Sequence, residues 1–155
     1  MDDDNRYAPP KAAVEGMTTQ GADAPPLWNP NAAANWCLLF SPVFGTWLHW
    51  KNWQMLGDSQ RAGTARNWVI AAVLVLAASM VIALAAEPGA RAINFLFLLA
   101  WYFTAARPQA RLVKERYGDR YPRRGWLAPI GIAIGAVIAL CIVIVGVVLA
   151  LGSRA

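Results

Sequence analysis

The stretch 107–126 carries the densest group of side chains that could bind a charged ligand. It reads RPQARLVKERYGDRYPRRGW and holds seven of the fourteen Lys and Arg residues, against two acids. The remaining residues balance in charge, so this stretch accounts for the whole formal net charge of +5. Such groups bind phosphate or carboxylate, and the stretch predicts contact with anionic lipid headgroups or with a protein partner. The predicted contact residues are Arg107, Arg111, Lys114, Arg116, Arg120, Arg123 and Arg124. Nucleic acid is not expected, because no recognised nucleic-acid-binding motif accompanies the charge.

Few other residues suggest chemistry. The single histidine, His49, cannot form a metal site alone and is expected to contact headgroups. A catalytic site would have to use interfacial groups such as His49, Asn52 and Asp58, which follow no recognised catalytic pattern. The cysteines, Cys37 and Cys141, lie in apolar runs and are expected to be buried thiols. The sequence therefore predicts no enzymatic activity, no cofactor and no metal site.

The elements that must position the basic stretch are apolar segments. Hydrophobic residues make up 57% of the chain, above the roughly 45–50% of soluble domains. The runs 67–86 and 126–152 contain no charged residue, and each reaches the roughly 20 residues that cross a bilayer as a helix. The run 91–106 is near the lower limit, and Pro108 is expected to end or kink it. The sequence predicts an all-α membrane protein with three or four transmembrane helices.

The first apolar segment, 32–50, is long enough to span but is interrupted by Pro42 and Gly45. We expect it to span the membrane; a re-entrant or surface-lying segment is the alternative, which would change only the side of the N-terminal tail. Residues 87–89, Glu-Pro-Gly, predict a tight turn between two antiparallel helices.

The N-terminal tail, 1–31, is rich in Asp, Pro, Gly and Ala and shows no apolar periodicity. We expect it to be disordered, without a cleavable signal peptide, and followed by a helical membrane domain over 32–152. Within its last residues, Asn29 and Pro30 predict a helix start, because Asn caps helices well and Pro suits the first helical position.

Charge predicts the orientation. Loops 51–66 and 107–125 hold ten of the fourteen basic residues, which places both loops in the cytoplasm and the C-terminus outside. Within the second loop, residues 107–117 alternate basic and apolar positions at helical spacing, which predicts a short amphipathic helix in the interface, stopped by Gly118. Tryptophans favour the headgroup level, and six are expected to form one belt there: Trp47, Trp50, Trp53, Trp68, Trp101 and Trp126.

Small and polar residues predict contacts between helices. Gly131, Gly135 and Ala139 stand four apart, a spacing that allows close helix approach. We expect this face to pack inside the monomer or to meet lipid, in preference to forming a homodimer. Asn94 is expected to bond a neighbouring helix.

The stretch FGTWLHWKNWQMLGD, 44–58, resembles small bacterial polytopic inner-membrane proteins of unknown function. The tail sequence NRYAPPKAAV and the loop KERYGDRYPRRGW are similar to the leader and basic loop of such proteins. The resemblance implies a bacterial inner-membrane location and no particular activity. Its matching residues are Phe44, Gly45, Leu48, Asn52, Trp53, Leu56 and Gly57.

These features predict a non-enzymatic accessory or interaction protein of the inner membrane, with a membrane-protein partner or a homo-oligomer as its assembly. One alternative is a passive pore or small-molecule carrier acting as an oligomer, for which Asn94 and Ser79 would line a polar path. A second alternative is a membrane immunity protein against a toxin.

Overall fold

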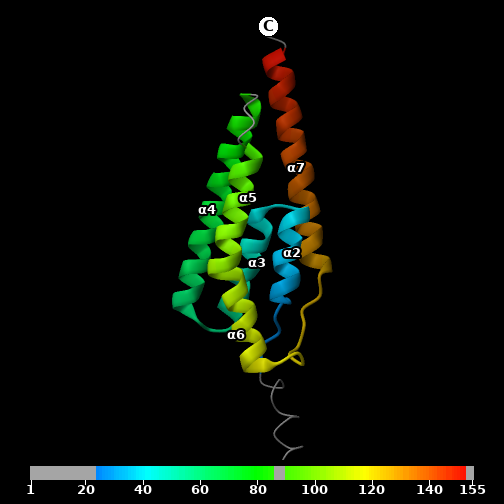
Figure 1. The fold of residues 1–155 in the computed structure, drawn as a ribbon. Coiled ribbons are helices and arrows are strands. Elements are labelled where there is room, and N and C mark those ends of the chain that lie inside the picture. Colours follow the sequence, from blue (N-terminus) through cyan, green and yellow to red (C-terminus); the bar gives the residue numbers. More distant parts are fainter. Residues whose placement is uncertain (1–23, 86–89, 153–155) are drawn as a thin grey trace, which may run out of the picture.

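The computed structural model describes residues 24–85 and 90–152 (Figure 1). This part of the chain is helical, apart from one isolated β-bridge. Its elements are α2 (Pro30–Leu39), α3 (Pro42–Met55), α4 (Ser59–Leu84), α5 (Ala90–Trp101), the π-helix η1 (Tyr102–Ala106), α6 (Arg107–Tyr117) and α7 (Leu127–Gly152).

Two helices of the described chain, α4 and α7, have the length and apolar composition to cross a membrane. Both expose large apolar side chains, including Val81 and Leu149, each 67% exposed. α7 coincides with the predicted run 126–152. α4 begins eight residues before the predicted run 67–86, because the Asp58 carboxylate accepts a hydrogen bond from the Arg61 backbone N–H (2.8 Å) and caps the helix there. The predicted turn at 87–89 lies outside the described residues.

α5, η1 and α6 form one continuous rod that returns beside α4 (Figure 1). The predicted amphipathic helix, 107–117, is therefore the end of this rod and not a separate helix. Pro108 does not end it. Proline cannot donate to the helix ladder and its ring crowds the preceding turn, and here that preceding turn is the wider π-helical η1, which ends at Ala106. Gly118 stops the rod with φ +66°, as the sequence predicts.

The segment 32–50 is not one helix. The chain reverses between α2 and α3, where the Ser41 side chain accepts from the Phe44 N–H (3.4 Å) and Pro42 occupies the first turn of α3. Asn52, near the end of α3, is hydrogen-bonded to Trp28, just before α2. The two helices are therefore antiparallel, and the end of α3 lies beside the start of α2 (Figure 1). A single spanning helix was thus the wrong expectation, and the segment folds back on itself.

Gly45 allows this hairpin to close. A Cβ built on Gly45 would lie 1.8 Å from the Cys37 Sγ, 3.0 Å from the Ala33 carbonyl oxygen and 3.3 Å from the Trp101 ring. Real Cβ atoms do not approach other atoms at the first of these distances, so α2 and α3 can be this close only with glycine at this position.

The last residues of the predicted disordered tail are ordered in the structure. Leu27 is fully buried, and it joins residues 122–124 through Leu27 N–H to the Pro122 carbonyl (3.0 Å) and Arg124 N–H to the Leu27 carbonyl (2.9 Å). Asn29 caps α2 with its side-chain oxygen. The prediction of disorder over 24–31 was therefore wrong, while residues 1–23 lie outside the described chain.

α7 joins the rest of the described molecule mainly near its start. Pro129 and Ala133 are buried, and Ala133 packs in a cluster with Trp28, Phe44 and Leu48. Farther along, an apolar groove of about 430 Å³ separates α7 from α3 and α4. The buried core consequently lies at one end of the molecule, around the α2–α3 hairpin.

Candidate anionic-headgroup interface

The seven predicted basic residues lie on α6 and on the loop that follows it, at the end of the molecule that also holds the α3–α4 turn (Figure 1). All seven side chains are exposed. None forms an ion pair with a carboxylate of the described residues, where the only such pair is Arg61 with Asp58 (3.4 Å). We call these seven residues the basic end. Their charges are available to external anions.

Aromatic contacts hold the loop of the basic end in place. The Arg124 guanidinium lies 4.5 Å from the ring centroid of Trp28, and its Nη1 contacts the Met55 Sδ at 3.1 Å. Arg123 lies over Tyr121 at 5.7 Å. The Trp28 indole N–H donates to the Gly125 carbonyl at 3.1 Å. Because cations over aromatic faces are attracted by the ring quadrupole, the loop keeps its charges outward without needing acidic partners.

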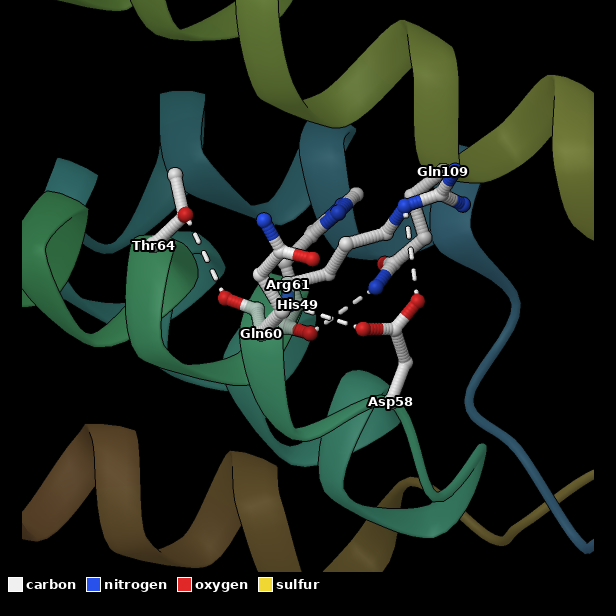
Figure 2. A network of polar contacts seen from close by, with 6 residues as sticks. All are labelled: His49, Asp58, Gln60, Arg61, Thr64 and Gln109. Carbon is white, nitrogen blue, oxygen red and sulfur yellow. Dashed lines mark hydrogen bonds and ion pairs between the residues drawn. The ribbon is translucent and has the colours of Figure 1, made fainter.

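On the opposite side of α6, buried polar contacts fasten this helix to α3. Gln109, fully buried, donates from Nε2 to the His49 backbone carbonyl at 2.9 Å (Figure 2). Val113, one turn along, is also buried. The amphipathic prediction therefore holds for the sides of α6: Arg107 and Arg111 face outward while Gln109 and Val113 face the hairpin.

His49 is buried, 2% exposed, and does not contact headgroups, so that expectation was wrong. Its Nε2 lies 3.1 Å from the Pro30 carbonyl oxygen, which can only accept, so Nε2 carries the proton. Nδ1 has no partner among the described residues, and the Trp101 ring stands edge-on at 5.1 Å. Burial lowers the pKa of His49 to about 4, partly offset by the Pro30 carbonyl. The side chain is a neutral link between α2 and α3.

Asn52 fastens the ordered end of the tail. Its Oδ1 accepts from the Trp28 backbone N–H (3.1 Å) and its Nδ2 donates to the Trp28 carbonyl (2.8 Å). The side chain thus pairs with one residue's backbone as a neighbouring strand would, in a segment with no sheet partner on that side. Asn52 is fully buried. Its position in the structure is that of a structural clamp.

Comparison with known proteins finds no matching family model, no matching curated protein and no matching solved structure. The resemblance to small bacterial inner-membrane proteins stays a prediction. The structure nevertheless gives several of its residues a packing role: Phe44, Gly45, Leu48, Asn52 and Trp53 are all buried.

The predicted tryptophan belt is wrong for two of its members. Trp101 is 2% exposed and Trp53 is 7% exposed, so neither can reach headgroups. Trp101 packs against α2 in a cluster with Cys37 and Ala106, and Trp53 packs against α4 in a cluster with Ala62 and Ala65. The other predicted belt residues are partly buried: Trp47, Trp50, Trp68 and Trp126.

The small residues of α7 have no helix against them in the described chain. Gly131, Gly135 and Ala139 are exposed, and a Cβ added to either glycine would meet no atom within 4 Å. Of the two expected surroundings, packing inside the monomer is therefore excluded for the described chain, while contact with lipid stays a prediction. Lipid and a second copy are the surroundings that stay open to this face.

The remaining predictions about single side chains are confirmed only in part. Asn94 donates from Nδ2 to the Ser79 Oγ at 2.6 Å, joining α5 to α4 as expected. Cys37 is buried, whereas Cys141 is exposed on α7, which corrects the expectation for that thiol. Among the described residues, no cluster of three or more His, Cys, Asp or Glu side chains could hold a metal ion.

Sequence reasoning missed Gln109 and Trp28 as organising residues. Gln109 stands four residues before Val113, so helical spacing places it on the apolar side of α6, and a polar residue there indicates an internal hydrogen bond. Trp28 carried a weaker signal, a large aromatic residue inside a tail otherwise poor in them.

Proposed function

We propose that this chain is a non-enzymatic accessory or interaction protein of the bacterial inner membrane, which holds its basic end against anionic headgroups on the cytoplasmic face. The observation that carries this proposal is the basic end itself. Seven exposed Lys and Arg side chains without carboxylate partners in the described chain gather beside two helices long enough to cross a membrane. Each such charge near an anionic leaflet gains roughly 1 kcal/mol.

The arrangement also supports one orientation. The α3–α4 turn and the loop after α6 meet at the same end of the molecule (Figure 1), so both basic loops would face the cytoplasm under the positive-inside rule. A reporter that fluoresces only in the cytoplasm is expected to be bright when fused after Arg124 and dark when fused after Ala155. The reverse pattern would contradict the orientation.

The carrier alternative receives no support from its predicted polar lining. The Asn94 amide donates to the Ser79 hydroxyl, and this hydroxyl donates to the Val75 carbonyl at 2.7 Å. A polar path would need these groups turned toward a passage.

Lipid selectivity tests the proposal. The full chain is reconstituted in phosphatidylcholine with spin-labelled phosphatidylglycerol or phosphatidylcholine as the probe. We expect preferential immobilisation of phosphatidylglycerol that weakens with salt, because the Debye length shrinks from about 10 Å at 0.1 M to about 3 Å at 1 M. Equal immobilisation of both probes at low salt would refute the headgroup role, and one stoichiometric protein partner recovered from native membrane would support the accessory role.

A further inference from the structure

The basic end is not a uniform surface, because one part of it is hollowed. A cavity of about 530 Å³ lies between the first turns of α4 and the rod formed by η1 and α6. Its size falls within the roughly 300–1,000 Å³ of small-molecule sites. Three arginines line it, Arg61 from α4 and Arg107 and Arg111 from α6, against one carboxylate, Glu115.

Both walls of this cavity change from apolar to basic at the same level. On α4, Arg61 and Thr64 precede Trp68, the second residue of the uncharged run of that helix. On the rod, Phe103 precedes Arg107 and Arg111. Trp68 packs edge-on against Phe97 at 5.7 Å, which continues the apolar side of the cavity along α5. A molecule in the cavity therefore meets cations at one end and hydrocarbon at the other.

The arginines differ in how they are held. The Arg61 guanidinium is fixed by Asp58 (3.4 Å) and lies over the Trp53 ring at 5.0 Å; Figure 2 shows it on the first turn of α4. The side chains of Arg107 and Arg111 form no hydrogen bond or ion pair with the described residues. The planar donor fork of each remains available for two parallel bonds to a phosphate group.

The π-helix forms part of the rod wall. Phe103, Thr104 and Ala105 line the cavity and all belong to η1. The wide turn thus directly precedes Arg107 in the wall of this hollow, and π-helical turns inside α-helices occur frequently at functional sites.

From these observations we infer that the cavity is a binding site for one anionic phospholipid, with the phosphate on Arg107 and Arg111 and the acyl chains leaving past Trp68 and Phe103. The inference rests on the proposed headgroup role and sharpens it: a bound lipid at one position replaces diffuse attraction. Arg61, which is paired with Asp58, adds polar N–H groups at the α4 wall.

The test compares two pairs of substitutions that remove the same charge. Arg107→Gln with Arg111→Gln alters the cavity, whereas Arg120→Gln with Arg123→Gln alters the basic end outside it. The full-length protein in non-ionic detergent is titrated with phosphatidylglycerol or phosphatidylcholine, and bound lipids are counted by native mass spectrometry. Thermal unfolding of each variant checks that the fold is kept.

We expect wild type to retain one phosphatidylglycerol per chain. The variant with Arg107→Gln and Arg111→Gln should bind this lipid at least about tenfold more weakly than the variant with Arg120→Gln and Arg123→Gln. One charge-assisted hydrogen bond is worth about a factor of ten in affinity. Equal weakening by both pairs would overturn the site and leave the headgroup role standing. If wild type showed no preference for phosphatidylglycerol over phosphatidylcholine, both the site and the headgroup role would be contradicted.

A competition arm separates lipid from soluble phosphate. We expect sn-glycerol 3-phosphate to displace the lipid poorly, because it has no chains to occupy the apolar wall. Binding of sn-glycerol 3-phosphate as tight as that of the lipid would overturn the assignment to a phospholipid.

Discussion

The hairpin end of the molecule and the far half of α7 are built on opposite principles. Around α2 and α3, side chains are buried and polar groups such as Asn52, His49 and Gln109 fasten one segment to another. Along the far half of α7, Ile142, Val145 and other apolar side chains are exposed and the described chain offers them few neighbours. One end is held by specific contacts within the protein, and the other depends on its surroundings.

This difference follows from how the backbone hydrogen bonds of each region are satisfied. A helix satisfies its own backbone hydrogen bonds, so α7 needs only an apolar medium around its side chains. The hairpin and the ordered tail contain irregular backbone at residues 24–29 and 40–41, and its polar groups must be paired by the protein itself. Substitutions should therefore be costly at the hairpin and nearly neutral on α7.

The largest effect is expected from Gly45→Ala. The added methyl group would overlap the buried Cys37 Sγ and crowd the Ala33 carbonyl, so α2 and α3 must separate, with a loss of about 3 kcal/mol in unfolding free energy, at the upper end for overpacking. Thermal unfolding in detergent measures it. Gly63→Ala is the matched control, because nothing lies within 4 Å of that Cβ and alanine favours a helix.

A double variant sharpens the same test. Cys37→Ala removes the sulfur that the new methyl group would meet. If close approach causes the loss, Gly45→Ala together with Cys37→Ala should be more stable than the sum of the two single losses predicts. Strict additivity would show that the loss arises elsewhere.

Acid should weaken the hairpin through His49. Its pKa is about 4 in the folded protein and about 6.5 in the unfolded chain, so the unfolded state takes up the proton first as pH falls. The contribution of His49 to the unfolding free energy is therefore fully present above about pH 6.5 and declines as the pH falls to about 4. The total loss from this group is about 3 kcal/mol. Unfolding by denaturant at a series of pH values measures it.

Substitution of the histidine identifies the source of this decline. The His49→Gln variant should lose stability at neutral pH but show a flatter dependence between pH 6.5 and 4, because glutamine does not titrate. An unchanged slope in that variant would assign the acid sensitivity to other groups.

A smaller loss is expected from Asn52→Leu. Leucine has a similar volume but leaves the Trp28 N–H and carbonyl without their partners, at a cost of about 2 kcal/mol. Limited proteolysis should then cut before α2 more readily than in wild type. Asn35→Ala is the control, since that side chain is exposed, and cleavage at the wild-type rate in the Asn52 variant would contradict the clamp.

The sequence predicted the apolar half of the fold far better than the hairpin end. The runs 67–86 and 126–152 are long and uncharged, which composition alone detects. The break at Phe40–Ser41 uses one serine cap before Pro42, and apolar side chains continue on both sides, so the hydropathy of 32–50 does not reveal the reversal.

Residue type also does not show whether a tryptophan packs inside the protein or faces the headgroups. Trp53 and Trp101 were expected to be interface anchors, but Trp101 packs against α2 of the hairpin and Trp53, on α3, packs against α4. The seven basic residues were predictable as exposed because unpaired charge stays in contact with water or headgroups. That two of them line a cavity with Arg61 depended on the return of η1 and α6 beside α4, which no local pattern specifies.

The smallest effect is expected from Gly131→Leu with Gly135→Leu, which tests the other side of the comparison. Nothing in the described chain lies within 4 Å of either added Cβ, so the larger side chains meet no neighbouring helix of the same molecule. Leucine is also the better helix former, by roughly 0.8 kcal/mol per position. The unfolding temperature should stay the same or rise slightly, and the mass of the protein in detergent should not change. A smaller mass, or a lower unfolding temperature at low protein concentration, would instead show that a second copy packs on this face, since small residues at this spacing allow two helices to approach closely. The far half of α7 would then be held by specific protein contacts as well, and the contrast with the hairpin end would not hold.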